Sequence, residues 1–314
     1  MRPARAALCR WATLVLALAV GFAGAGGGAL AGAGRQPDSV IGAPARLVAR
    51  VDDTLLDIAR TYDLGYVEIR AANPGVDPWL PGGGREIVLP TQHVLPNAPH
   101  RGIVINLAEL RLYYYPPDGS APRSYPIGIG GAGKETPVGR TRIVRKQQHP
   151  VWTPTASERA EEPGLPDRIG PGPDDPMGDY ALYLGWSGYA IHGTNRPYSI
   201  GRRDSHGCIR LYPEDIADLY RRVGIGTPVT VVDQPVKIGW LGGALYLEVH
   251  AGQDAADAIE ADGRFAGPSL TDADDAVAKA AGAAAAAVDW YVVDLAALRR
   301  SGVAVRVSPV LPSG

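Results

Sequence analysis

The chain has 314 residues, enough for two modest domains with separate hydrophobic cores. Hydrophobic residues make up 46% and charged residues 20% of it, a balance typical of globular rather than disordered proteins. The formal net charge of -2 argues against nucleic acid or an anionic membrane as the main partner. Forty glycines and 28 prolines against two phenylalanines indicate many turns and short strands, which favours a mainly β architecture.

Residues 1–33 have the pattern of an export signal. Basic residues precede an apolar run from Trp11 to Phe22, and small residues follow. This run is shorter than the roughly 20 residues that a membrane-spanning helix needs, so cleavage is favoured over a retained anchor. Cleavage would remove Cys9 and leave Cys208 without a partner for an internal disulfide.

A small unit is predicted at residues 46–91, after a polar linker. Asp53 and Thr54 can cap a first helix, and the Asn-Pro-Gly run at 73–75 ends a second one. With a strand at each end, the order is strand, helix, helix, strand. The sequence DDTLLDIARTYDLGYVEIRAANPGVDPWLPGGGREIVLP resembles a LysM module, which implies binding to glycan that contains N-acetylglucosamine. The alternative is a LysM-like scaffold that only packs against its neighbour.

A second domain is predicted at residues 101–234, after another linker at 91–101, and is rich in strands. The expected strand pairs are 103–105 with 111–115, 125–129 with 140–144, and 180–185 with 189–193. A helix over 213–223 and a strand over 228–232 follow. Residues 150–178 hold many prolines and few periodic apolar residues, which indicates a long functional loop or lid.

Residues 235–314 form a C-terminal extension of unclear role. No motif with chemistry is found in it. The expected elements are strands at 244–249 and 302–307 and alanine-rich helices near 254–261 and 271–288.

The chemistry is concentrated in the run IHGTNRPYSIGRRDSHGCIRL, residues 191–211. His192 stands sixteen residues before Cys208, and Ser205, His206 and Gly207 directly precede the cysteine. A thiolate is the nucleophile, and an imidazole nearby can take the thiol proton and later return it to a leaving amine. Gly207 suits a sharp turn, and the consecutive amides of Gly207 and Cys208 could form an oxyanion hole.

Two other interpretations of this run stay open. Two histidines and a cysteine could bind zinc, but His206 and Cys208 lie two residues apart on an extended segment with little reach for a common metal. No CxxC or HExxH motif accompanies them. A purely structural cluster of buried histidines is the second alternative. We predict neither a metal nor a cofactor.

The same run resembles the signature of YkuD-type L,D-transpeptidases, and the string GPDDPMGDYALYLGWSGYAIHGTNRPYSIGRRDSHGCIRLYPEDIADLY resembles the ErfK/YbiS/YcfS/YnhG branch. The resemblance covers residues 101–234. It implies a mainly β fold, a YkuD-like β-sandwich with a flanking helix, preceded by the small βααβ LysM-like domain. The implied site has Cys208 as nucleophile, His192 as general base, Gly193 orienting the imidazole through its carbonyl, His206 and Gly207 shaping the oxyanion site, and Ser205 supporting the loop.

Arg210 occupies a position that varies between Asn and Arg, where it would bind a stem-peptide carboxylate or be a solvated charge. The resemblance implies acyl transfer on peptidoglycan in the periplasm, without a cofactor and with inhibition by carbapenems. Peptidoglycan would be the partner. The acyl acceptor would be a diaminopimelate amine, a lysine of an outer-membrane lipoprotein, or water. No nucleic acid is expected as a partner, and the sequence does not indicate the oligomeric state. The alternatives are a thiol amidase or carboxypeptidase and a non-catalytic peptidoglycan-binding protein.

Overall fold

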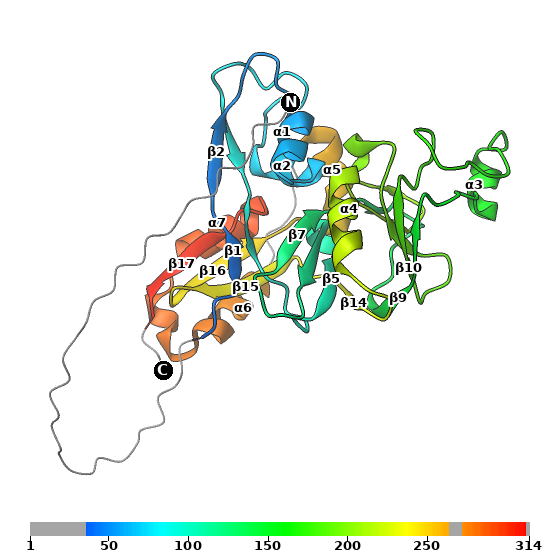
Figure 1. Ribbon diagram of the computed structural model, residues 1–314. Coiled ribbons are helices and arrows are strands. Elements are labelled where there is room, and N and C mark those ends of the chain that lie inside the picture. The colour runs from blue at the N-terminus through cyan, green and yellow to red at the C-terminus, as the bar shows by residue number, and fades with distance from the viewer. Residues whose placement is uncertain (1–35, 264–271, 312–314) are drawn as a thin grey trace, which may run out of the picture.

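The computed structural model describes residues 36–263 and 272–311 (Figure 1). The predicted export signal, residues 1–33, lies outside the described residues. None of the helices in the described ranges is long and apolar enough to cross a membrane.

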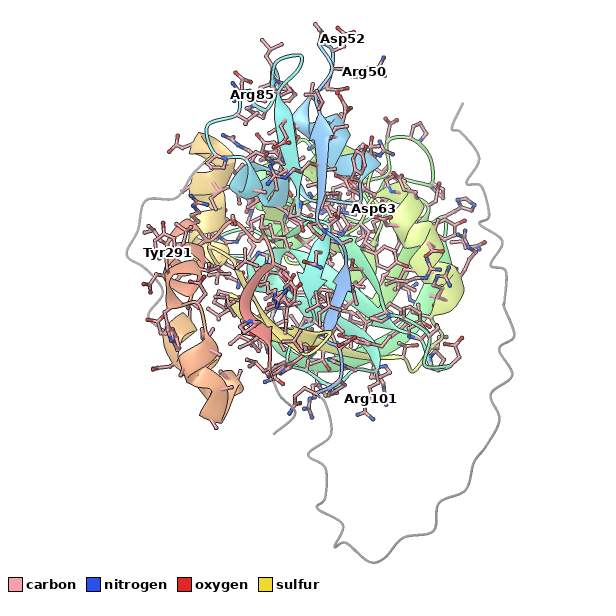
Figure 2. All side chains as sticks on the ribbon, turned by 90° about the vertical axis from the view of Figure 1, so that its left-hand side faces the viewer. Arg50, Asp52, Asp63, Arg85, Arg101 and Tyr291 are labelled. Carbon is pink, nitrogen blue, oxygen red and sulfur yellow. The ribbon has the colours of Figure 1, made fainter. Side chains whose placement is uncertain are left out.

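The N-terminal unit, at the top of Figure 1, has the predicted order of strand, helix, helix and strand. Its elements are β2 (Ala45–Val48), α1 (Leu55–Thr61), α2 (Tyr66–Ala72) and β3 (Glu86–Leu89). Thr54 caps α1 as predicted, because its hydroxyl accepts the N–H of Asp57 at 3.1 Å. Figure 2 shows the charged side chains of Arg50, Asp52 and Arg85 at the tip of this unit, where they face solvent.

Both predicted linkers contain a strand. These are β1 (Val40–Gly42) and β4 (Gln92–Val94), which pair antiparallel. Val94 is fully buried, and its backbone contacts the C-terminal part of the protein. The linkers are therefore part of the folded structure.

A large mixed sheet forms the second part and carries the candidate site. Its strand order is β13-β11-β10-β9-β14-β5-β6-β7, in which β11 with β13 and β14 with β5 are parallel pairs. The strands are β5 (Gly102–Asn106), β6 (Arg111–Tyr115), β7 (Arg123–Pro126), β9 (Gly139–Gln148), β10 (Tyr180–Leu184), β11 (Ala190–His192), β13 (Ile209–Arg210) and β14 (Pro228–Val232). The helix α4 (Pro213–Arg222) packs on this sheet through Ile216 and Leu219, both fully buried in the main core. The mainly β fold with a flanking helix is therefore confirmed.

One predicted strand pair is wrong. Residues 125–129 and 140–144 were expected to pair, but β7 pairs with β6, and β9 pairs with β10 and β14. The segment between them does not close a hairpin because it passes close to the cysteine. Gly130 donates its N–H to Thr136 Oγ1, whose hydroxyl donates to Gly207 O at 2.8 Å. A short parallel ladder of β8 (Ile129–Gly130) with β12 (Arg203–Ser205) forms there instead.

The C-terminal part has a three-stranded antiparallel sheet of its own. Its elements are β15 (Val236–Leu241), β16 (Ala244–Val249), α5 (Gln253–Asp262), α6 (Asp272–Ala281), α7 (Trp290–Arg299) and β17 (Val305–Val310), with a 3₁₀ turn at Gly282–Ala287. Two further 3₁₀ turns, at Leu107–Glu109 and Pro197–Ser199, lie in the second part of the protein. β17 begins later than the strand predicted at 302–307, and α7 was not predicted. Figure 1 shows α5 beside the two helices of the N-terminal unit.

Candidate active site

The register of two neighbouring strands brings His192 and Cys208 to one face of the sheet. β11 and β13 run parallel, with Ile191 opposite Ile209 and His192 opposite Arg210. Side chains alternate along a strand, so both isoleucines enter the core while His192 and Arg210 point to the other face. Cys208 directly precedes β13 and packs against Ala190 on that same face. The pairing of the strands therefore puts both side chains on one face of the sheet, and a hydrogen bond between them stays a prediction.

The imidazole of His192 is buried and held in one tautomer. Its Nδ1 lies 2.7 Å from the carbonyl oxygen of Gly193, so Nδ1 carries the proton and Nε2 is an acceptor. Burial, with a smaller effect of the Arg210 charge, lowers the pKa of His192 to about 4. The ring is therefore neutral near pH 7 and able to accept a proton. The Gly193 carbonyl thus contacts the imidazole, and its role in orienting the ring for catalysis stays a prediction.

The thiol of Cys208 is partly exposed and can be approached from outside. Burial raises its pKa above the ordinary value, although the Arg210 charge acts in the opposite direction. The Sγ atom contacts the carbonyl oxygen of Gly188 at 3.5 Å, and no hydrogen bond joins it to His192 in the described part of the chain. The resting site therefore holds a neutral thiol and a neutral imidazole, and proton transfer between them stays a prediction.

The turn before the cysteine is held by Ser205. Its hydroxyl accepts the N–H of Gly207 at 3.1 Å and donates to the carbonyl of Cys208 at 2.6 Å. Gly207 has a φ of +105°, and a Cβ added there would lie 2.8 Å from Tyr189 Cε1, so glycine is required. The Gly207 amide is thus used within the turn. No acceptor for the Cys208 amide is found among the described residues, and its role as an oxyanion donor stays a prediction.

His206 lies in a charged cluster with two glutamates of the predicted lid and with Lys134, which lies outside the lid. The lid contains one helix, α3 (Ala156–Glu161). The His206 Nε2 atom lies 3.0 Å from Glu161 Oε2, and Lys134 Nζ lies 2.5 Å from the same carboxylate. Glu158 lies 3.5 Å from His206 Nδ1. Sequence reasoning missed these three partners, because they are far from the motif and follow no recognisable spacing.

Arg210 is paired rather than free in this structure. Its Nη1 lies 2.9 Å from Asp204 Oδ1. The guanidinium still shares a face with His192, and its charge favours the neutral imidazole and the thiolate. The predicted role in binding a substrate carboxylate requires this ion pair to open or to be shared.

The residues that could hold a metal lie elsewhere. His93, Glu109 and Glu248 form the one such group found in the described ranges, and it includes neither Cys208 nor His192. The Lys237 ammonium already lies among them, 2.6 Å from Glu109 and 2.9 Å from Glu248. The group is therefore a buried ion-pair network, in which lysine supplies the positive charge.

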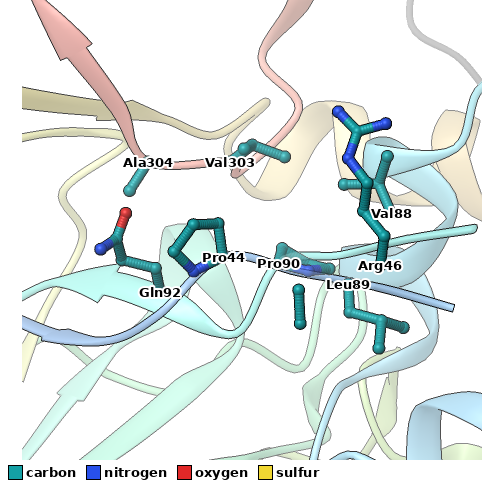
Figure 3. A pocket seen from close by; sticks show the side chains of 9 residues that line it. Pro44, Arg46, Val88, Leu89, Pro90, Gln92, Val303 and Ala304 are labelled. Atoms are coloured by element: carbon teal, nitrogen blue, oxygen red, sulfur yellow. The ribbon is translucent and has the colours of Figure 1, made fainter.

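Two cavities lie between the N-terminal unit and the C-terminal part. One of about 410 Å³ has Pro44, Pro90 and Gln92 on one side and Val303 and Ala304 on the other (Figure 3). A larger one of about 710 Å³ continues toward α7. Neither is lined by the cysteine or by the histidine of the site.

A mainly β domain with a thiol and a neutral imidazole on one face of paired strands has the parts of a cysteine acyltransferase. Residues 100–231 match the family model of the YkuD L,D-transpeptidase catalytic domain. The relative named "Probable L,D-transpeptidase YbiS" of Escherichia coli (strain K12) is 44% identical over 257 residues, which are 80% of this chain and 82% of that protein. The chain therefore belongs to the L,D-transpeptidase family.

Further relatives carry the same family name. "Probable L,D-transpeptidase ErfK/SrfK" of Escherichia coli (strain K12) is 48% identical over 198 residues, 61% of this chain and 64% of that protein. The solved catalytic domain of the Enterococcus faecium L,D-transpeptidase is 25% identical, with a TM-score of 0.35 over 44% of this chain and 100% of that one. This score is too low to carry an argument, so the assignment rests on the sequence relatives.

Proposed function

We propose that this L,D-transpeptidase acts on peptidoglycan stem peptides with Cys208 as its nucleophile. The thiolate attacks the carbonyl of the third residue of a tetrapeptide stem, the bond to the terminal D-alanine breaks, and a thioester forms. An amine then attacks the thioester and releases the thiol. A diaminopimelate amine as acceptor gives a 3–3 cross-link, and a lipoprotein lysine gives a protein attached to the wall.

The observation that supports this proposal is the shared face of Cys208 and His192, with Nδ1 of the imidazole held by Gly193. A neutral Nε2 accepts the thiol proton and returns it to the departing D-alanine amine, so the protons balance over the acylation step. The Cys208 amide, for which the described residues offer no acceptor, is the proposed hydrogen-bond donor to the oxyanion. Neither step requires a metal or a cofactor.

Intact-mass spectrometry with a carbapenem tests the assignment. The mature protein is expected to gain the mass of one inhibitor molecule, and Cys208→Ala is expected to gain none. An unmodified wild-type protein, under conditions in which a known L,D-transpeptidase reacts, would contradict the proposed function. Muropeptides from cells with and without the gene would then identify the acceptor, as 3–3 dimers or as stems linked to protein.

The N-terminal unit is proposed to bind the glycan strand in the periplasm, after export by the signal at residues 1–33. The loops between its strands and helices expose three large apolar side chains, Val51, Trp79 and Leu80. An exposed tryptophan can stack on a sugar ring. Trp79→Ala is expected to weaken co-sedimentation with purified sacculi at least several-fold while carbapenem acylation stays unchanged. Equal sedimentation of both proteins would contradict a role of Trp79 in glycan binding.

A further inference from the structure

The loop between the proposed base and the proposed nucleophile is in contact with the N-terminal unit. Residues 193–202 connect the end of β11 at His192 to the start of β12, and the turn to Cys208 follows. Only the three residues of β12 separate the loop from the turn to Cys208. A change in the position of the loop can therefore alter where the thiol lies relative to the imidazole.

The first two amides of helix α2 bind this loop. Tyr66 N donates to Ile200 O, and Val67 N donates to Gly201 O, both at 3.1 Å. The first N–H groups of a helix have no partner within it, and here two of them find acceptors in the catalytic domain. The N-cap amide at Gly65 is bound by Glu68 Oε2 at 2.9 Å, so it does not compete for the loop.

Backbone contact at Gly201 is closer than a side chain would permit. A Cβ at this position would lie 2.1 Å from Tyr66 N and 2.4 Å from Gly65 Cα. A Cβ on Gly65 would in turn lie 2.8 Å from Gly201 Cα. The other side of the loop is fixed to the sheet, since Gly201 N donates to Ile127 O at 3.1 Å. The glycine thus lies between helix α2 and the sheet.

Side chains hold the same arrangement. The Arg202 guanidinium lies 3.7 Å from the centre of the Tyr66 ring. Helix α2 is fixed to β6 by a buried ion pair, in which Arg111 Nη2 lies 2.7 Å from Glu68 Oε2. The N-terminal unit therefore packs directly against the catalytic domain through helix α2, and it is not joined to that domain by the linker alone.

We propose that the N-terminal unit is a positioning element of the active site, which acts through the contact of helix α2 with Gly201. This role rests on the proposed function and goes beyond glycan binding. By fixing residues 193–202, the helix sets the position of the turn from Ser205 to Cys208 relative to His192. The unit is then required for thiol reactivity even when no glycan is present.

Gly201→Ala in the mature full-length protein tests the proposal. The expected result is a fall of about tenfold to a hundredfold in the rate constant of carbapenem acylation, because displacements near 1 Å have such effects. The pH profile of Cys208 alkylation by iodoacetamide is expected to shift as well, which a general loss of stability would not cause. Gly119→Ala is the matched control: its φ is +75° against +81° at Gly201, and an added Cβ there meets nothing within 4 Å.

A second pair of variants decides the question if Gly201→Ala does not fold. Arg202→Gln removes the contact with Tyr66, the hydrogen bond from Arg202 Nε to Tyr198 O within the loop, and the ion pair of Arg202 with Glu260 of α5. Glu260→Gln removes the ion pair alone. Acylation that is slower in Arg202→Gln than in Glu260→Gln supports the proposal, and equal rates in the two would overturn it.

The outcomes separate this inference from the proposed function. Equal acylation rates and equal alkylation profiles in wild type, Gly201→Ala and Gly119→Ala would overturn the positioning role and leave the transpeptidase assignment intact. A wild type that no carbapenem acylates contradicts the assignment itself. In that case the alkylation profiles still report whether helix α2 positions the thiol.

Discussion

The ring of His192 donates its Nδ1 proton to the carbonyl oxygen of Gly193, 2.7 Å away. A backbone acceptor here does the orienting work that an acidic side chain does in a serine triad. Because that acceptor carries no charge, it does little to hold a proton on the ring, and burial keeps the imidazole neutral.

Replacing His192 by Gln is expected to slow carbapenem acylation by about a hundredfold to ten thousandfold, the usual contribution of a general base. Glutamine retains a polar side chain of similar size but cannot accept the thiol proton. Stopped-flow fluorescence or timed mass spectrometry measures the rate. His100→Gln, at an exposed histidine, is the control and should react like wild type. A His192→Gln protein that reacts at the wild-type rate would exclude the ring as base.

In the absence of substrate, the alkylation rate of Cys208 should increase only at high pH. Burial raises the pKa of Cys208, so the thiolate fraction should reach one half above the ordinary thiol value of about 8.5. The rate constant for iodoacetamide, measured from pH 5 to 10, should therefore show a midpoint above that value. A midpoint below pH 7 would mean a resting thiolate–imidazolium pair, contrary to the neutral pair inferred from the structure.

Ser205→Ala should destabilise the turn before the cysteine. It removes the hydroxyl that bonds both the Gly207 amide and the Cys208 carbonyl, at a cost of about 1–3 kcal/mol in the free energy of unfolding. Urea denaturation followed by circular dichroism measures this. Ser199→Ala is the matched control, because the buried Ser199 hydroxyl has no hydrogen-bond partner among the residues that the structure describes and its removal should cost nothing. Equal losses in both variants would contradict the role of Ser205.

Asp215 in helix α4 should make stability depend on pH. Burial, with the charges of Asp63 and Glu214, raises its pKa to about 8, well above its value in the unfolded chain near 3.9. The folded state thus holds a proton that the unfolded state releases. The contribution of the neutral Asp215 carboxyl to the free energy of unfolding is therefore complete below pH 4 and is lost as the pH rises through 8.

Asp215→Asn should remove this dependence. At pH 7 to 8 the variant is expected to be more stable than wild type, and near pH 4 the two should be alike. Thermal unfolding across this range measures the difference. Asp167→Asn, at a carboxylate with 98% exposure, should follow the wild-type curve. A wild type that gains stability over Asp215→Asn as the pH rises would contradict the raised pKa.

Lys237→Met should destabilise the protein by about 3–5 kcal/mol, because it leaves the buried carboxylates of Glu109 and Glu248 without their cation. Guanidinium denaturation measures the loss. Lys279→Met, at an exposed lysine of α6, is the control and should change stability little. A chelator should have no effect on either protein if the ammonium is the resident cation.

The sequence predicted the parts of the fold that local rules determine. Thr54 precedes an apolar helical pattern, Ile216 and Leu219 lie on one face of α4, and both patterns formed as expected. The partners of β7 and β9 could not be predicted, since alternation shows that a segment is a strand but not which strand it joins. Helix α7 was missed because apolar and polar residues are not clearly segregated along it.

The residues of the candidate site likewise include some that the local sequence predicts and others that it does not. Its residues within the 191–211 run were found because the run is continuous and chemically unusual. Thr136 and Lys134 reach the same turn from another part of the chain, and Glu161 from the lid. Their contacts depend on the tertiary arrangement of segments that are far apart in the sequence, and short-range sequence patterns do not predict that arrangement.

The buried lysine network also limits how the enzyme can be divided for laboratory use. A recombinant fragment that stopped at residue 234, where the transpeptidase resemblance ends, would lack Lys237 and would expose the Glu109 carboxylate and the Tyr113 hydroxyl at a cut surface. Such a fragment is a poor reagent for inhibitor screening or crystallisation. A fragment that keeps this network intact would have to continue through β16, because Glu248 on that strand pairs with Lys237.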